Sequence, residues 1–222
     1  MTTTLITGAN RGIGLAIAKQ AVGVGHAVIG TARKPGEAIE LRDLGVRVCQ
    51  LDTADPVSVE ALRTELDGTP IDNLINNAAI FPDRSGLDAT DLDDFEATMR
   101  VNVRGPIAVT RALLENVRAS ERKTVATISS SMGSIAGTKS GGSYAYRASK
   151  AAVNMLVRAM SAEIEDVTFL AVDPGWVRTD MGGSDAALST EESAAGVFGV
   201  MSNATRAQSG LFYRHDGERL DW

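Results

Sequence analysis

The sequence is poor in the residues that build disulfides and metal sites. Cys49 is the only cysteine, and the two histidines, His26 and His215, form no cluster at metal-ligand spacing. We therefore expect no intrachain disulfide and no bound metal. The chain also lacks an apolar run of the ~18 to 20 residues that a membrane span needs. Its N-terminus lacks the basic and apolar regions of a signal peptide. These absences predict a cytoplasmic protein without a membrane segment.

Positive charge is in deficit as well. The chain has 22 Lys and Arg against 28 Asp and Glu, a net charge of −6. Because this balance disfavours long-range attraction to nucleic acid or anionic lipid, we expect neither partner. A length of 222 residues with 44% hydrophobic content is typical of one globular domain that needs no disulfides to fold. We therefore expect a single domain over residues 1–222 whose function depends on a pocket for a small molecule.

Short aliphatic runs alternate along the chain with stretches of helical periodicity. This repeated order, with several strands that are almost entirely apolar, is typical of a parallel sheet covered by helices on both faces. The prediction is an α/β, doubly wound, Rossmann-like domain of about seven strands, in which ligands bind beyond the carboxyl ends of the strands. The predicted strands are 3–7, 27–31, 46–51, 74–76, 124–129, 168–172 and 210–214. The predicted helices are 15–21, 37–44, 57–66, 95–117, 148–164 and 191–200.

A glycine-rich turn, Thr7–Gly14, follows the first predicted strand and opens a helix; we call it the glycine loop. Its glycines let the backbone turn tightly and approach a pyrophosphate, whose charge is favoured at a helix N-terminus. The spacing, G-x3-G-x-G, differs from the G-x-G-x-x-G of two-domain dehydrogenases. Such turns also occur for packing reasons alone, so the other strand ends must decide. The residues assigned to the nucleotide here are Gly8, Asn10, Arg11, Gly12, Ile13 and Gly14.

The ends of the next strands offer further groups to a nucleotide. No acid follows the second strand, where an NAD enzyme usually places one, but Arg33 does. Arg33 and Arg11 could clamp a 2′-phosphate, or they are solvated surface residues. Asp52, after the third strand, could accept a hydrogen bond from adenine; the alternative role, capping the next helix, suits Asp55 better. The fourth strand ends in Asn76, and the segment Asn77, Ala78 and Ala79 is expected beside the cofactor.

Tyr146 and Lys150 form the most informative pair in the sequence. A spacing of i, i+4 near the start of a helix places the phenol and the ammonium on one face. The cation favours the phenolate, and a tyrosine, with an ordinary pKa of about 10, needs such help to act as an acid or base near neutral pH. In isolation the pair is explained as well by an ordinary amphipathic helix. The glycine loop, the serines after the fifth strand and Asn102 favour the catalytic interpretation.

Taken together, these motifs resemble the single-domain short-chain dehydrogenases/reductases over nearly the whole chain, and most closely the carbonyl-reductase branch that includes sniffer and C-factor. The family resemblance rests on the order Thr7-Gly-x-x-x-Gly-x-Gly14, Asn76-Asn77-Ala78, Asn102, Ile128-Ser129-Ser130, Tyr146-x-x-x-Lys150 and Pro174-Gly175-x-x-x-Thr179. The branch is indicated by Tyr144–Lys150, Pro174–Gly183, Glu191–Gly196 and Gly217–Trp222.

The resemblance implies a role for each matching residue. Tyr146 would donate the proton in carbonyl reduction, and Lys150 would activate it and hold the nicotinamide ribose. Ser130 would bind the substrate oxygen, and Asn102 would hold a water that links Lys150 to solvent. Pro174, Gly175, Val177 and Thr179 would bind the nicotinamide end of the cofactor. The family also implies a homodimer or homotetramer.

The sequence leaves the roles of some positions open. Ala79 replaces the glycine usual in the family, which adds a methyl group near the pocket. Three serines in a row make the catalytic serine ambiguous by one, and we choose Ser130. Trp176 and Met181 are expected to form a substrate wall, although packing at the sheet end is an alternative. We expect a short substrate loop at about 176–190. Met132 completes the set of expected substrate-pocket residues.

The predicted function is an NADPH-dependent oxidoreductase that reduces an aldehyde or ketone, reversibly, to an alcohol; NADH is the alternative cofactor. A different class of function, a cofactor-binding signalling or redox-sensor protein of the C-factor type, is the alternative. The complete set of Tyr146, Lys150, Ser130 and Asn102 favours the enzyme, because a binding module needs no proton relay.

Overall fold

The computed structural model describes all residues, 1–222, and its centre is one parallel sheet. The strand order is β3-β2-β1-β4-β5-β6-β7, and each neighbouring pair is parallel. The reversal of order between β1 and β4 leaves the crevice in which such sheets bind ligands. The predicted doubly wound, Rossmann-like fold is therefore confirmed. The strands are β1 (Thr3–Ile6), β2 (Ala27–Ala32), β3 (Arg47–Gln50), β4 (Asn73–Asn76), β5 (Thr124–Ile128), β6 (Thr168–Asp173) and β7 (Leu211–Arg214).

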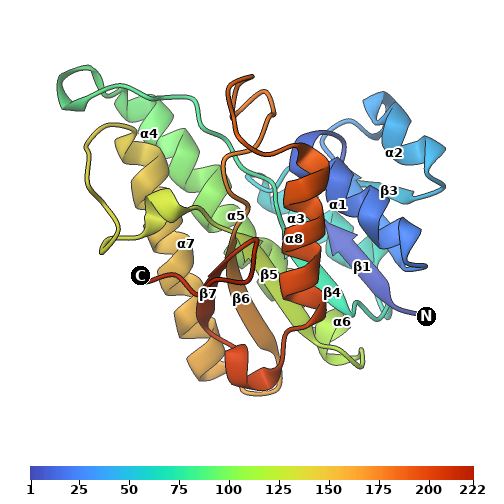
Figure 1. Cartoon of the computed structure of the whole chain (residues 1–222). Coiled ribbons are helices and arrows are strands. Elements are labelled where there is room, and N and C mark those ends of the chain that lie inside the picture. Colours follow the sequence, from blue (N-terminus) through green and yellow to red (C-terminus); the bar gives the residue numbers. More distant parts are fainter.

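Helices cover both faces of the sheet (Figure 1). On one face α1 and α8 pack against each other and, with α2, against the strands; α3, α5, α6 and α7 pack on the other. The helices are α1 (Gly12–Gly23), α2 (Ile39–Asp43), α3 (Pro56–Glu65), α4 (Leu92–Met99), α5 (Gly105–Ala112), α6 (Leu114–Arg118), α7 (Tyr144–Glu163) and α8 (Thr190–Ser202).

Two hydrophobic cores explain why the strands are apolar without alternation. Successive strand residues point to opposite faces, so Leu5 joins the core under α3, α5 and α7 while Ile6 joins the core under α1 and α8. Phe169 and Leu170 divide in the same way on β6. Both faces of the sheet are therefore buried under helices, as expected for a parallel sheet.

The prediction of a single helix over 95–117 is wrong. The structure divides it into α4, a π-helical segment at Arg100–Arg104, α5 and α6. Pro106 lacks the backbone N–H that would bond to the carbonyl four residues before it, at Asn102, so regular α-helical bonding is interrupted there. Hydrophobic periodicity alone does not register such a bulge. It matters because the π-helical segment carries Asn102.

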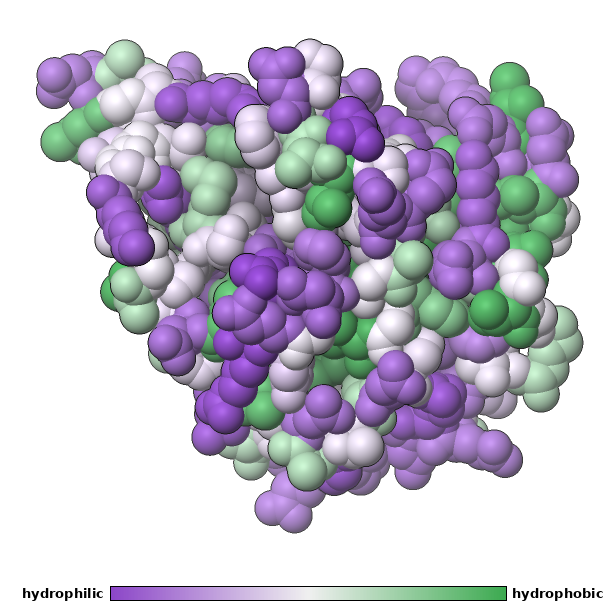
Figure 2. Space-filling model, in the orientation of Figure 1, coloured by the Kyte–Doolittle hydropathy of each residue, from purple (hydrophilic) through white to green (hydrophobic).

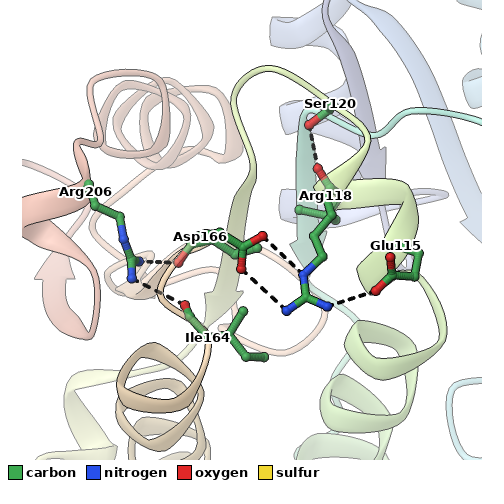
Figure 3. Close-up of polar contacts among 8 residues, drawn as sticks. Glu115, Arg118, Ser120, Ile164, Asp166 and Arg206 are labelled. Carbon is green, nitrogen blue, oxygen red and sulfur yellow. Dashed lines mark hydrogen bonds and ion pairs between the residues drawn. The ribbon is translucent and has the colours of Figure 1, made fainter.

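Ion pairs and hydrogen bonds tie the loops together at the amino ends of the strands (Figure 3). Arg118, on α6, contacts Glu115 at 2.9 Å and Asp166, before β6, at 3.2 Å. Arg206 donates to the carbonyl oxygens of Val167 and Ile164. These contacts join the segment before β6 to α6 and to the segment before β7.

No helix is long and apolar enough to cross a membrane. The face seen in Figure 2 is mostly hydrophilic, and its hydrophobic residues lie in separate small areas.

Candidate active site

The glycine loop presents unpartnered backbone donors at the carboxyl end of β1. The N–H groups of Gly12, Ile13 and Gly14 make no hydrogen bond, and no acidic side chain lies in the first turn of α1. Close packing requires the glycine at position 14, because a Cβ there would lie 2.4 Å from the Gly8 carbonyl oxygen and 2.6 Å from Nδ2 of Asn77. Free N–H groups at a helix N-terminus fit a phosphate group.

The two arginines of the predicted phosphate clamp have different surroundings. Arg33 is exposed and makes no hydrogen bond or ion pair. Arg11 is also exposed but pairs with Asp180 of the substrate loop, at 2.5 Å between Nη1 and Oδ2. The glycine loop touches the substrate loop a second time, since a Cβ on Gly12 would lie 3.4 Å from Cγ2 of Thr179. Arg33 is thus available to an anion, whereas Arg11 has a competing carboxylate.

The groups after β3 and β4 serve mainly to hold the loops. Asp52 accepts a hydrogen bond from the Ala54 N–H, and the Asp55 side chain caps α3 as expected. Asn77 donates to the carbonyl oxygens of Thr7 and Gly8 at 2.9 and 3.1 Å, which ties the end of β4 to the glycine loop. A Cβ on Gly8 would lie 3.1 Å from the Cα of Ala78. Asn10 is exposed in the loop, and Ala79 is partly buried just beyond the end of β4.

Tyr146 and Lys150 lie near the start of α7, beside the end of β5. Only 9% of the Tyr146 surface and 2% of the Lys150 surface is exposed. Lys150 Nζ lies 5.5 Å from the Tyr146 ring centroid and donates to the Ile128 carbonyl oxygen at 2.7 Å. A Cβ on Gly133 would lie 2.7 Å from the Lys150 backbone, so the loop after β5 packs directly on this turn of α7.

Burial dominates the ionisation of both groups. Burial, with a smaller contribution from the Asp173 carboxylate, raises the pKa of Tyr146 to about 12, against the lowering effects of Ser130 and Arg84. Burial also lowers the pKa of Lys150 to about 8, against a smaller opposite effect of Asp173. Because the buried amine gives up its proton first, the lysine does not by itself make Tyr146 an acid of neutral pKa in the chain without cofactor.

The three consecutive serines have three different partners. Ser129 is buried and bonds to Oδ1 of Asn154 at 2.6 Å. Ser131 lies near the Asp173 carboxylate, whose pKa it lowers. Ser130 lies near Tyr146, whose pKa it lowers, and its Oγ accepts the Met132 N–H at 3.1 Å. The geometry therefore favours the second serine over its neighbours.

Asn102 connects the π-helical segment to the site. Its Oδ1 accepts the Ile80 N–H at 2.8 Å, and its Nδ2 donates to the Ile80 carbonyl at 2.9 Å and to Ser149 Oγ at 3.1 Å. Asn102 thus fixes the chain just after β4 against the turn of α7 that carries Lys150.

The segment after β6 contains the remaining predicted residues. Gly175 has φ +78°, and a Cβ there would lie 2.9 Å from the His215 ring, so only glycine fits. Val177 is buried and bridges to Leu188, which closes the base of the substrate loop. Thr179 accepts the Gly182 N–H at 3.0 Å.

Trp176 and Met181 differ in solvent exposure and in their hydrogen bonds. Trp176 is 58% exposed, and its Nε1 donates to the Gly182 carbonyl oxygen. Met181 is partly buried, and its carbonyl oxygen accepts a hydrogen bond from Arg84. Pro174 is buried, and its carbonyl oxygen accepts the Ser193 hydroxyl at 2.7 Å.

The sequence did not indicate several residues at the site. Phe81 stacks on Tyr146 with 4.1 Å between ring centroids, and Arg84 lies over the Phe81 ring. Asp173 is a buried carboxylate that influences both Tyr146 and Lys150. An acid at the end of an apolar strand, directly before Pro174, is a signal that could have found Asp173. No such signal identifies Phe81 and Arg84, because their loop follows no periodic pattern.

Comparisons with known proteins identify the family of the chain. The family model for short chain dehydrogenases matches residues 2–188. The chain belongs to the short-chain dehydrogenase family. This membership confirms the predicted family and the prediction of an NAD(P)-dependent oxidoreductase. C-signal of Myxococcus xanthus is 40% identical over 166 residues, which are 74% of this chain and all of that protein.

Solved structures of carbonyl reductases share the fold of this short-chain dehydrogenase. Carbonyl reductase Sniffer of D. melanogaster superposes with a TM-score of 0.96 at 30% identity, over 100% of both chains. The NADPH-bound carbonyl reductase from chicken fatty liver superposes with a TM-score of 0.91 at 30% identity, over 100% of this chain and 98% of that one. These likenesses cover the glycine loop, the residues around Tyr146 and the substrate loop.

Proposed function

We propose that this short-chain dehydrogenase reduces an aldehyde or ketone to an alcohol with NADPH, and catalyses the reverse reaction. The observation that carries the proposal is the meeting of Tyr146, Ser130 and Lys150 at the same end of the sheet as a glycine loop whose first helical N–H groups are free. The similarity to carbonyl reductases, one of them NADPH-bound, supports the same reaction class.

The residues present fit such a cofactor. The unpartnered N–H groups of Gly12, Ile13 and Gly14 would hold its pyrophosphate. Lys150 would bind the nicotinamide ribose, and Val177 and Thr179 would hold the nicotinamide end. When bound, the cofactor supplies a hydride to the substrate carbonyl carbon. The protein contributes orientation and the proton.

The proton transfer follows from the side chains. Ser130 Oγ hydrogen-bonds the substrate oxygen as negative charge develops on it, and the Tyr146 hydroxyl donates a proton to that oxygen. Lys150 stabilises the phenolate left behind. The phenolate then regains a proton from solvent by way of Lys150. In the reverse direction Tyr146 accepts the proton from the alcohol. Asn102 holds this part of the site in place and, in our proposal, the water that links Lys150 to solvent.

The preference for NADPH rests on Arg33. This guanidinium is exposed and unpaired at the end of β2, and no carboxylate stands in the position that would bind a ribose 2′-hydroxyl. Arg11 contributes only after it leaves Asp180. We expect Arg33→Ser to weaken NADPH binding at least tenfold and NADH binding by less than twofold. Asp180→Asn should instead tighten NADPH binding several-fold, because it releases Arg11. Equal effects on both cofactors would contradict the clamp.

The substrate wall and the assembly are further parts of the proposal. In this proposal Trp176, Met181 and Met132 would form the wall of the substrate pocket, and a short substrate loop would leave the pocket open to small carbonyl compounds. We propose a dimer or tetramer, as the family resemblance implies. Sedimentation of the purified protein at the mass of one chain, 23.3 kDa, would contradict that assembly.

The match to C-signal favours a second candidate, a signalling protein in which cofactor binding rather than turnover carries the message. The two candidates predict different outcomes for one variant. If the biological effect of the protein persists in Tyr146→Phe after turnover is lost, the signalling role is supported. If the effect disappears together with turnover, the enzymatic role accounts for it.

The first experiment is a titration of the purified chain with NADPH and with NADH, followed by nicotinamide fluorescence. Tighter binding of NADPH supports the proposal and justifies a screen of aldehydes and ketones by NADPH oxidation. Preference for NADH contradicts the role of Arg33. Binding of neither cofactor contradicts the proposed reaction itself.

A further inference from the structure

Tyr146 is held from its outer side by a column of side chains from the loop after β4. The Phe81 ring lies 4.1 Å from the Tyr146 ring, centroid to centroid, with only 15° between their planes. The Arg84 guanidinium carbon lies 4.4 Å from the Phe81 centroid, on a cation–π contact. Lys150 completes the column, 5.5 Å from the Tyr146 centroid. The phenol ring is thus part of a stack with a cationic side chain at each end.

Arg84 brings a charge that no acid neutralises. It forms no salt bridge, and its hydrogen bond goes to the Met181 carbonyl oxygen, which joins it to the substrate loop. The acid next to it, Asp83, is engaged with the backbone N–H groups of Ser85 and Asp91. The positive charge of Arg84 is therefore free to act on the stacked rings beneath it.

The other charged groups facing Tyr146 come from two elements. On α7 itself lies Lys150, whose pKa of about 8 means that it is largely neutral at alkaline pH. At the end of β6 lies Asp173, which opposes formation of a phenolate. Ser130, after β5, favours the phenolate through its hydroxyl. An arginine keeps its charge across this whole pH range, so Arg84 is the cation that persists when Tyr146 must lose its proton.

We propose that Phe81 and Arg84 are positioning residues for the proton transfer at Tyr146. Phe81 fixes the phenol ring and keeps water from its outer face, and Arg84, seated on Phe81, supports the phenolate with a permanent charge. This inference rests on the proposed function for its kinetic consequences. The ionisation of Tyr146 can be measured without turnover, so the two proposals can fail separately.

The two side chains should affect Tyr146 in opposite directions. Because burial is the largest cause of the raised pKa of Tyr146, Phe81→Ala admits water and should make the phenol ionise at lower pH. Because Arg84 lowers this pKa, Arg84→Met should make it ionise at higher pH, and Arg84→Lys should stay close to the wild type. If Arg84→Met merely loosened the loop, it would instead lower the pH at which Tyr146 ionises, as Phe81→Ala does.

The turnover-free test is an alkaline titration of tyrosinate absorbance on the purified chain. Subtracting the titration of Tyr146→Phe isolates Tyr146 from the other two tyrosines, Tyr144 and Tyr213. Opposite shifts for Phe81→Ala and Arg84→Met support the proposal. Unchanged titrations, or shifts of the same sign, overturn it.

The kinetic test is the pH dependence of kcat for alcohol oxidation, in which Tyr146 acts as the base. On the rising part of the profile we expect Arg84→Met to lower kcat by about two- to fivefold and to move the profile to higher pH, with KM nearly unchanged. Arg84→Lys should restore the profile. Arg147→Met is the matched control, because this neighbouring arginine donates to Gly142 and Ser140 rather than to the stack.

The outcomes separate the two proposals. If the wild type turns over and Arg84→Met has the wild-type profile, the role of Arg84 is wrong although the proposed reaction holds. If Arg84→Lys is as impaired as Arg84→Met, the effect is due to shape rather than charge, and the proposal is also wrong. If the wild type turns over no carbonyl or alcohol, the proposed reaction fails, and the absorbance titration still decides the inference.

Discussion

The two edges of the sheet handle polar groups in opposite ways. At the amino ends of the strands, Asp72 accepts hydrogen bonds from Thr3 and Arg122, and Arg118 pairs with two acids. At the carboxyl ends, Lys150 and Asp173 are buried without an ion pair, and the first N–H groups of α1 have no partner. Ion pairs and hydrogen bonds contribute to the stability of the folded chain, whereas buried charges without an ion pair and free N–H groups are typical of places that bind ligands or move protons. The polar contacts at the amino ends of the strands thus serve stability, whereas the groups at the carboxyl ends suit ligand binding and proton transfer.

Removal of the Tyr146 hydroxyl should give the largest effect on the carboxyl edge. Tyr146→Phe deletes the proposed proton donor, and we expect kcat for carbonyl reduction to fall by about 10²- to 10⁴-fold. The fluorescence titration with NADPH should be unchanged. The control is Tyr144→Phe, two residues earlier and more exposed, which should keep the wild-type kcat. A Tyr146→Phe enzyme with near wild-type kcat would refute the assignment.

Two buried asparagines test the contrast between the edges directly. Asn102 at the carboxyl edge bonds to Ile80, and Asn116 at the amino edge donates to the Leu66 and Thr69 carbonyl oxygens at 2.7 and 2.9 Å. Each alanine variant removes side-chain hydrogen bonds to buried or partly buried backbone groups, so both should lose about 1 to 3 kcal/mol of unfolding free energy in urea. Only Asn102→Ala should also lower kcat of the folded protein. Equal loss of kcat in both would erase the contrast.

Burial of Lys150 predicts a pH-dependent stability. Its pKa is about 8 in the folded chain, below the usual 10.5, so above pH 8 the unfolded chain binds more protons than the folded one. Unfolding free energy therefore rises with pH from about 8 towards 10.5 and is flat, at its lower level, below pH 8. Tyr146 acts in the opposite sense above pH 10, because its folded pKa is raised to about 12.

The measurement is urea unfolding without cofactor between pH 7 and 9.5. Relative to Lys150→Met, the wild type should gain on the order of 2 kcal/mol over this range. The exposed Lys19 gives the control, and Lys19→Met should follow the wild type. Parallel curves for the wild type and Lys150→Met would show that the amine is not desolvated as described.

The smallest effect is expected at the amino edge. Arg118 is partly exposed, and its two acidic partners are more exposed still, so solvent screens both contacts. Arg118→Met should change the unfolding free energy by at most about 1 kcal/mol and leave kcat and KM unchanged. A larger loss in urea unfolding would mean that the network in Figure 3 stabilises the loops more than isolated surface pairs do.

Much of the fold and the centre of the site could be predicted from the sequence. The apolar strands at 124–129 and 168–172 and the glycine loop have local signatures, because strand burial and helix entry depend on neighbouring residues. Tyr146 and Lys150 were identified for the same reason, as a pair four residues apart. The long helix over 95–117 was predicted wrongly, because periodicity averages over the interruption at Pro106.

The sequence by itself determined the order of strands and helices along the chain, the glycine loop and the pairing of Tyr146 with Lys150. These features depend on contacts between near neighbours. Tertiary structure alone decided which of three serines faces Tyr146, that Asp180 engages Arg11 and that Phe81 and Arg84 cover the phenol. It also decided that burial raises one pKa and lowers the other. The physical reason is that solvent exclusion and charge proximity are set by residues far apart in the chain, which the fold brings together.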